Sequence, residues 1–81
     1  DEEGRSLLYR ILSELRTLEE WTSETIESVL RSFSGREDVK LGAVAQPLRA
    51  AITGRSVSPG IFEVLEVLGP KESLSRISDQ I

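Results

Sequence analysis

Three residue types that carry much of protein chemistry are missing: the 81 residues include no cysteine, no histidine and no methionine. Without cysteine and histidine, the chain lacks the thiolate and imidazole groups of most nucleophilic triads, thiol redox sites and zinc sites. We therefore predict no catalytic residue and no metal site. Because a translated gene product starts with methionine, we also expect this chain to be part of a longer protein.

Long apolar runs are missing as well. No stretch approaches the roughly 20 apolar residues that a membrane-spanning helix needs. The first four residues, Asp-Glu-Glu-Gly, do not resemble a secretion signal. A net charge of −4 argues against a protein that binds nucleic acid through bulk electrostatics alone. We expect a soluble, cytoplasmic monomer that contacts neither membrane nor DNA.

The charges that are present are unevenly distributed. Residues 1–38 carry five arginines against ten acids, whereas residues 39–62 carry three cations and no acid. An acid-free window of 24 residues in so acidic a chain points to an anionic partner for that stretch. The alternative is that this window arose by chance, and charge alone does not decide between the two interpretations.

Apolar residues recur at intervals of three and four through most of the chain, the spacing of amphipathic helices. No segment alternates with the two-residue period of a strand. We predict an all-α fold, a compact bundle of about five short helices, in a single domain over residues 1–81. The expected helices span 7–18, 23–33, 40–54, 59–68 and 70–81.

Several helix ends are predicted from local chemistry. Thr22 should cap the second helix, with Trp21 and Ile26 forming a hydrophobic staple. That helix should end at Ser34-Gly35, and the third at Gly54. Pro47 should kink the third helix or split it near Gln46, because proline removes a hydrogen bond. The fourth helix has the broadest apolar face, so we expect it to be the most buried.

The segment from Lys40 to Ile77 reads KLGAVAQPLRAAITGRSVSPGIFEVLEVLGPKESLSRI. It strongly resembles the C-terminal end of bacterial glutamyl-tRNA synthetases, and the similarity extends more weakly to the start of the chain. The specific blocks are AQPLRAA at 45–51, TG at 53–54 and SPGIF at 58–62, followed by LG at 68–69. Ala43 departs from the family, which often carries lysine or another polar residue there.

The resemblance implies that the chain is the outer, C-terminal subdomain of an anticodon-binding region. The class I catalytic domain would lie upstream, and the complete enzyme would join glutamate to tRNA(Glu) using ATP and magnesium. The expected partners are tRNA(Glu) and the upstream domains of the same enzyme. This domain itself would hold no cofactor.

Family members contact anticodon bases at positions that correspond here to Arg49, Ser58, Pro59 and Ile61. Arg49 and the expected exposed loop at residues 58–61 also suit this task physically, because unstacked bases are read by arginine planes, apolar platforms and backbone groups. Lys40 and Arg55 are candidate phosphate contacts; the alternative is that their charges are simply solvated.

The anticodon-contact residues have structural alternatives too. Arg49 could pair with Glu63 or Glu66 on the surface of the bundle. Ser58-Pro59 forms a good helix start, so a structural and a binding role are compatible there. Ile61 begins a broad apolar face and could belong to the core instead.

Two other functions compete with tRNA recognition. A helical protein-interaction module would dock through an exposed apolar face, and the acidic charge favours it. A DNA-binding helix-turn-helix would need several basic and amide side chains on its recognition helix. The predicted fourth helix carries Glu63 and Glu66 instead, which argues against DNA binding.

Overall fold

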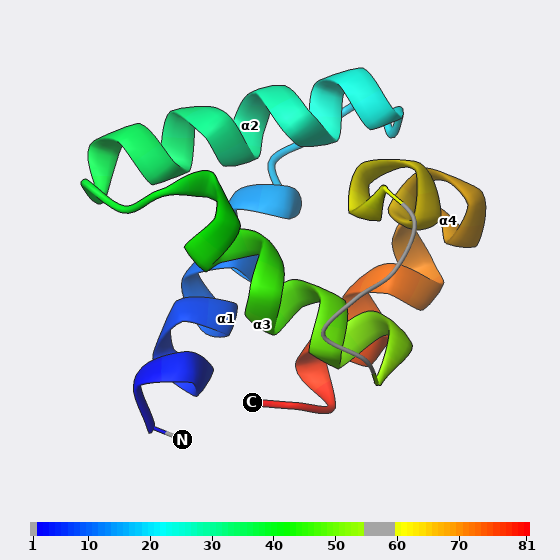
Figure 1. Cartoon of the computed structure of the whole chain (residues 1–81). Helices are drawn as coiled ribbons and strands as arrows, with labels where there is room; N and C mark the ends of the chain where they lie inside the picture. The colour runs from blue at the N-terminus through cyan, green and yellow to red at the C-terminus, as the bar shows by residue number, and fades with distance from the viewer. Residues whose placement is uncertain (1, 55–59) are drawn as a thin grey trace.

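A computed structural model of the chain describes residues 2–54 and 60–81. These residues form four helices and no strand, so the predicted all-α fold is confirmed with four helices rather than about five (Figure 1). The helices are α1 (Glu2–Leu15), α2 (Ser23–Arg36), α3 (Leu41–Thr53) and α4 (Ile61–Ser78).

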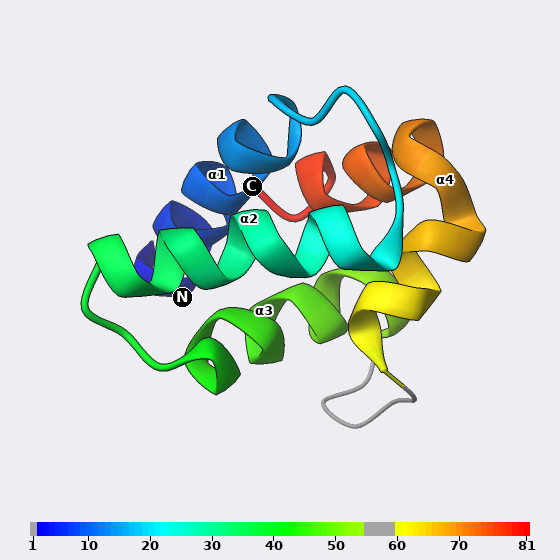
Figure 2. The same cartoon turned by 90° about the horizontal axis from the view of Figure 1, so that it is seen from above.

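The four helices enclose one apolar core, and each helix contacts the other three (Figures 1 and 2). Every helix contributes buried side chains at intervals of three or four residues, apart from one longer gap within α4. The predicted apolar faces of the first three helices are therefore confirmed, although α1 spans Glu2–Leu15 rather than the predicted 7–18, so Leu18 lies beyond its end. The buried apolar residues are Leu8, Ile11, Leu12, Leu15, Ile26, Leu30, Phe33, Val44, Ala45, Leu48, Ile52, Ile61, Leu65 and Ile77.

Helix α2 begins as predicted, because Thr22 is its N-cap. The Thr22 hydroxyl accepts a hydrogen bond from the Thr25 N–H at 3.1 Å, and the Thr25 hydroxyl accepts one from the Thr22 N–H at 3.0 Å. This reciprocal pair is a capping box, which satisfies two amides that have no partner inside the helix.

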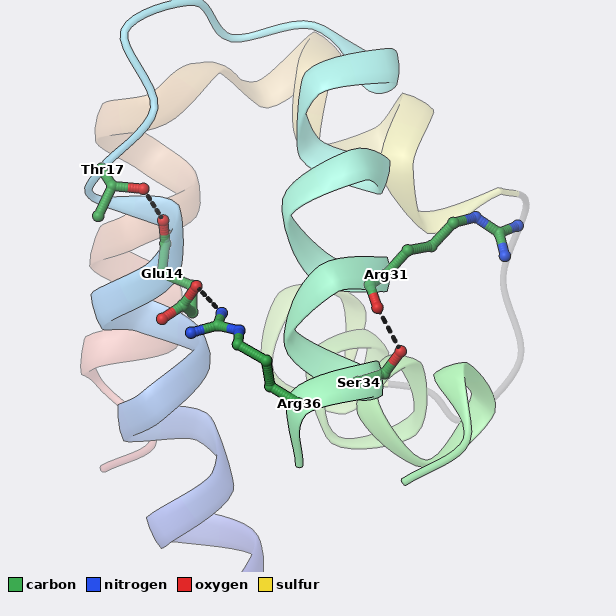
Figure 3. A network of polar contacts seen from close by, with 5 residues as sticks. All are labelled: Glu14, Thr17, Arg31, Ser34 and Arg36. Atoms are coloured by element: carbon green, nitrogen blue, oxygen red, sulfur yellow. Dashed lines mark hydrogen bonds and ion pairs between the residues drawn. The ribbon is translucent and has the colours of Figure 1, made fainter. Parts of the chain in front are cut away.

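The predicted end of α2 at Ser34-Gly35 is wrong, since the helix continues to Arg36. Arg36 forms an ion pair with Glu14 of α1, and the Ser34 hydroxyl donates to the Arg31 carbonyl at 2.9 Å (Figure 3). The left-handed backbone that reverses the chain lies at Asp38, with φ of 55°. Aspartate tolerates this conformation better than most residues, so no glycine is needed there.

Helix α3 is continuous from Leu41 to Thr53, with Pro47 inside it, and so the predicted division into two short helices did not occur. Proline cannot donate the usual hydrogen bond to the carbonyl four residues earlier. Four side chains of α3 are nonetheless buried along one face, and this burial offsets the lost bond. The predicted cap at Gly54 is confirmed: its φ is 75°, and its N–H donates to the Ala50 carbonyl at 2.9 Å.

Helix α4 joins the two helices predicted for the C-terminal region, but it is broken at Gly69. The φ and ψ of Gly69 are 84° and 165°, outside the helical region, and the following Pro70 has no N–H to donate. The segments before and after Gly69, residues 61–68 and 70–78, are called the first and second halves of α4. The predicted stop at Gly69-Pro70 is thus present as a break inside one element.

The prediction that the first half of α4 is the most buried helix was wrong. Ile61 and Leu65 are buried, but Val67 is 86% exposed, and Phe62 and Val64 are only partly buried. A helix in a small bundle meets the core along one face, and an apolar surface wider than that face remains in solvent.

Two glycine substitutions should change stability in opposite directions. Gly69→Ala should lower the free energy of unfolding by about 1–3 kcal/mol, because essentially only glycine adopts its backbone conformation. Gly35→Ala should raise it by up to about 1 kcal/mol, since Gly35 lies within α2 with open space around its Cα. Urea unfolding of both variants tests the pair, and similar stability changes would contradict the break at Gly69.

Candidate functional site

The most unusual polar group in the described residues is the guanidinium of Arg49. Arg49 lies one turn before the end of α3 and is partly exposed. Its Nε is the one buried side-chain nitrogen or oxygen in residues 2–54 and 60–81 that has no hydrogen-bond partner. An unsatisfied buried donor costs about 1–3 kcal/mol, so such groups are uncommon outside binding sites. Because this Nε is enclosed by the protein, a partner would meet the exposed part of the guanidinium instead.

The alternative in which Arg49 pairs with an acid of α4 is not supported. The ion pairs between described residues are Arg10–Glu37, Arg31–Glu27, Arg36–Glu14 and Arg76–Glu72. The Glu66 carboxylate instead accepts a hydrogen bond from the Ser23 N–H. The Glu63 carboxylate lies against Gly60, so close that a Cβ atom added to Gly60 would overlap the carboxylate.

The backbone at the end of α3, next to Arg49, receives hydrogen bonds from two side chains. The Thr53 hydroxyl donates to the Arg49 carbonyl at 2.8 Å. Arg76 of α4 donates to the Ile52 carbonyl at 2.9 Å while its Nε bonds Glu72 at 2.7 Å. The Ile52 carbonyl is one of those at the end of α3 that have no partner within the helix, and the Thr53 hydroxyl adds a second donor to the Arg49 carbonyl. Arg49 therefore belongs to a helix end that is tied to α4 through Arg76.

The other predicted anticodon contacts lie around the start of α4. Ser58 and Pro59, like the predicted phosphate contact Arg55, lie outside the described residues. Ile61 is the first residue of α4, and its side chain is 2% exposed. The structure thus places this side chain in the core, in agreement with the structural alternative. From this position, the backbone N–H of the first helical turn is what Ile61 can offer to a partner.

Lys40 is not brought together with Arg49. It is the exposed N-cap residue of α3, nine positions before Arg49. At 1.5 Å and 100° per residue, the two lie about 13 Å apart along the axis and on opposite sides of the helix. The acid-free window in the sequence is therefore not a single basic surface.

Two features were not foreseen from the sequence. The indole N–H of Trp21 donates to the Leu65 carbonyl at 2.8 Å, across 44 positions of sequence. On the surface of α4, Gly60, Glu63, Val64, Val67 and Leu68 line an apolar groove of about 260 Å³. The broad apolar face of the predicted helix 59–68 was the available signal for this groove, but our prediction assigned that face to the core.

Other site types were searched for within residues 2–54 and 60–81. No three acidic, cysteine or histidine side chains there lie close enough together to hold a metal ion. No helix in this part of the chain has the length and apolar character to span a membrane.

The four helices define a small all-α domain. Sequence comparison identifies its class, because the family described as an anticodon binding domain matches residues 1–81. The chain belongs to this family.

Its relatives include glutamate–tRNA ligase 1 of Brucella melitensis biotype 1, which is 51% identical over all 81 residues. Glutamate–tRNA ligase of Bradyrhizobium diazoefficiens is 55% identical over 78 residues, 96% of the chain. The chain spans 17% and 16% of these two relatives, respectively. It therefore corresponds to the anticodon-binding part of much longer ligases.

Proposed function

We propose that this domain reads the anticodon of tRNA(Glu) as the C-terminal module of a glutamate–tRNA ligase. The observation that supports this most strongly is the match of the whole chain to the anticodon-binding family, together with a partly exposed Arg49 that takes part in none of the ion pairs between described residues. An anticodon loop presents unstacked bases whose edges carry hydrogen-bond acceptors. A guanidinium offers planar, forked N–H donors that suit such an edge.

The other residues have distinct proposed roles. Ser58 and Pro59 would contact anticodon bases beside Arg49, and Ile61 would contribute its backbone N–H rather than its side chain. Lys40 and Arg55 would contact phosphates. These roles follow from the family resemblance and from the chemistry of each group.

The complete protein would join glutamate to tRNA(Glu) in the cytoplasm as a monomer, using ATP and magnesium. Neither histidine nor cysteine is present here, and the described acids do not cluster. Groups that bind ATP and magnesium would therefore belong to other domains of the polypeptide. This domain would contribute recognition, while those domains would contribute catalysis.

A protein-interaction module is the second candidate, and the apolar groove beside the exposed Val67 favours it. The two functions differ in salt dependence, because phosphate contacts release counterions whereas apolar docking does not.

If the domain recognises tRNA, the isolated chain should bind it only weakly, with a Kd of about 1 µM or higher, since its net charge is −4. With two phosphate contacts to a single strand, the logarithm of affinity should fall with the logarithm of salt at a slope of about −1.4. A titration from 50 to 300 mM salt measures both.

Replacing Lys40 and Arg55 with alanine should flatten the slope and weaken binding to all tRNAs alike. Nanomolar binding by the domain alone would contradict the proposed division of labour. No tRNA binding, together with capture of a protein partner through the Val67 groove, would favour the second candidate.

A further inference from the structure

The carbonyl of Leu65 is the meeting point of three parts of the fold. It accepts hydrogen bonds from the indole N–H of Trp21 at 2.8 Å and from the hydroxyl of Ser73 at 3.2 Å. A carbonyl oxygen has two lone pairs, so both donors can be accommodated. Trp21 comes from the connection between α1 and α2, Leu65 from the first half of α4, and Ser73 from the second half.

These bonds lie beside the break in α4. At Gly69 the backbone leaves the helical region, and Pro70 provides no N–H for the carbonyls before it. The regular hydrogen-bond ladder therefore does not fix the angle between the two halves. The Ser73 hydroxyl, fully buried, bonds across the break to Leu65.

The connection before α2 holds the first half of α4 at a second point. The Ser23 N–H donates to the Glu66 carboxylate, next to the residue that Trp21 bonds. Two adjacent residues of α4 are thus tied to the entry of α2. The first half of α4 packs between α2 and α3, as Figures 1 and 2 show.

The orientation of this half-helix matters for recognition because Ile61, whose backbone N–H is proposed to face tRNA, is its first residue, whereas Arg49 belongs to α3. The angle of the first half therefore determines how far the start of α4 lies from Arg49. Rotation of the first half about Gly69 would shift Gly60 and Ile61 relative to α3, and so relative to Arg49.

We infer that Trp21 and Ser73 are positioning residues for anticodon recognition, which they support by fixing the first half of α4 through the Leu65 carbonyl. This inference rests on the proposed function. Neither residue contacts tRNA in this account. Each acts by holding the start of α4 in register with Arg49.

The test uses Trp21→Phe in the full-length ligase, since phenylalanine keeps an aromatic ring and removes the N–H donor. Ile11→Val, a core substitution in α1, serves as the control for loss of stability. Each protein is assayed for kcat/KM with tRNA(Glu) and with tRNAs substituted at single anticodon bases. Hydrogen exchange is followed at the backbone amides of both halves of α4.

Trp21→Phe should reduce discrimination between correct and substituted anticodons by about threefold to tenfold, the effect of losing one hydrogen bond. Its amide exchange should accelerate in residues 61–68 more than in residues 70–78. Ile11→Val should lower the melting temperature and leave discrimination unchanged. Ser73→Ala removes the other donor to the Leu65 carbonyl with a smaller loss of volume, and it should reduce discrimination in the same way.

Unchanged discrimination in both Trp21→Phe and Ser73→Ala would overturn the inference, and so would an equal loss in Ile11→Val. These results would leave the proposed function intact, because the wild-type ligase would still discriminate between anticodons. A wild-type ligase that fails to discriminate would instead refute the proposed function, and the inference with it.

Discussion

Leu65→Ala is expected to lower the free energy of unfolding of the 81-residue chain by about 2–5 kcal/mol, a large share of the stability of so small a domain. Leu65 is fully buried and belongs to the core that all four helices share. Truncation would leave a cavity that the surrounding helices fill only partly. Guanidinium unfolding monitored by far-ultraviolet circular dichroism measures the change.

Val67→Ala provides the matched control, two residues further along the same helix. Val67 is 86% exposed, so this substitution should change stability by less than about 0.5 kcal/mol. A loss below 1 kcal/mol in Leu65→Ala, or equal losses in both variants, would contradict the packing of α4 described here.

Arg49→Met is expected to change stability and recognition in different directions. The methionine side chain reaches as far as the arginine Nε and has no N–H group, so it removes the buried unsatisfied donor together with the rest of the guanidinium. The melting temperature of the free protein should stay the same or rise. The value of kcat/KM for tRNA(Glu) in the full-length ligase should fall by about 5-fold to 150-fold, equivalent to about 1–3 kcal/mol of recognition.

The control for Arg49 is Arg16→Met, which removes a solvent-exposed cation in the turn after α1. It should leave both the melting temperature and kcat/KM nearly unchanged. A large drop in the melting temperature of Arg49→Met would show that Arg49 is a structural residue. The lower activity of that variant would then follow from instability.

Much of the fold follows from the sequence because burial and helical geometry act together. The core faces of α1, α2 and α3 were predicted from apolar spacing, since a helix of 3.6 residues per turn must place those side chains on one side. The caps at Thr22 and Gly54 were predicted because each depends on a few neighbouring atoms.

Features that depend on tertiary packing were predicted less well. Pro47 does not divide α3, because the buried face of the whole helix outweighs one missing hydrogen bond. Gly35 does not end α2, which continues to Arg36 and its ion pair with α1. Val67 looks apolar enough for the core, but neighbouring helices leave its side of α4 uncovered.

The candidate site was also predicted only in part. Family resemblance singled out Arg49, but only coordinates show that its Nε is buried without an acceptor and that neither Glu63 nor Glu66 pairs with it. The bond from Trp21 to Leu65 joins residues 44 positions apart. No local pattern predicts such a contact, because it depends on how the connection before α2 packs against α4.

The most direct test of the central claim is base-by-base discrimination by the full-length ligase and its Arg49→Met variant. Each enzyme is assayed with tRNA(Glu) and with tRNAs carrying one substituted anticodon base. We predict that the wild type discriminates at the base that Arg49 contacts and that Arg49→Met loses discrimination at that base alone. An equal loss at every anticodon position, or unchanged discrimination in the folded variant, would contradict the assignment of Arg49 as an anticodon reader.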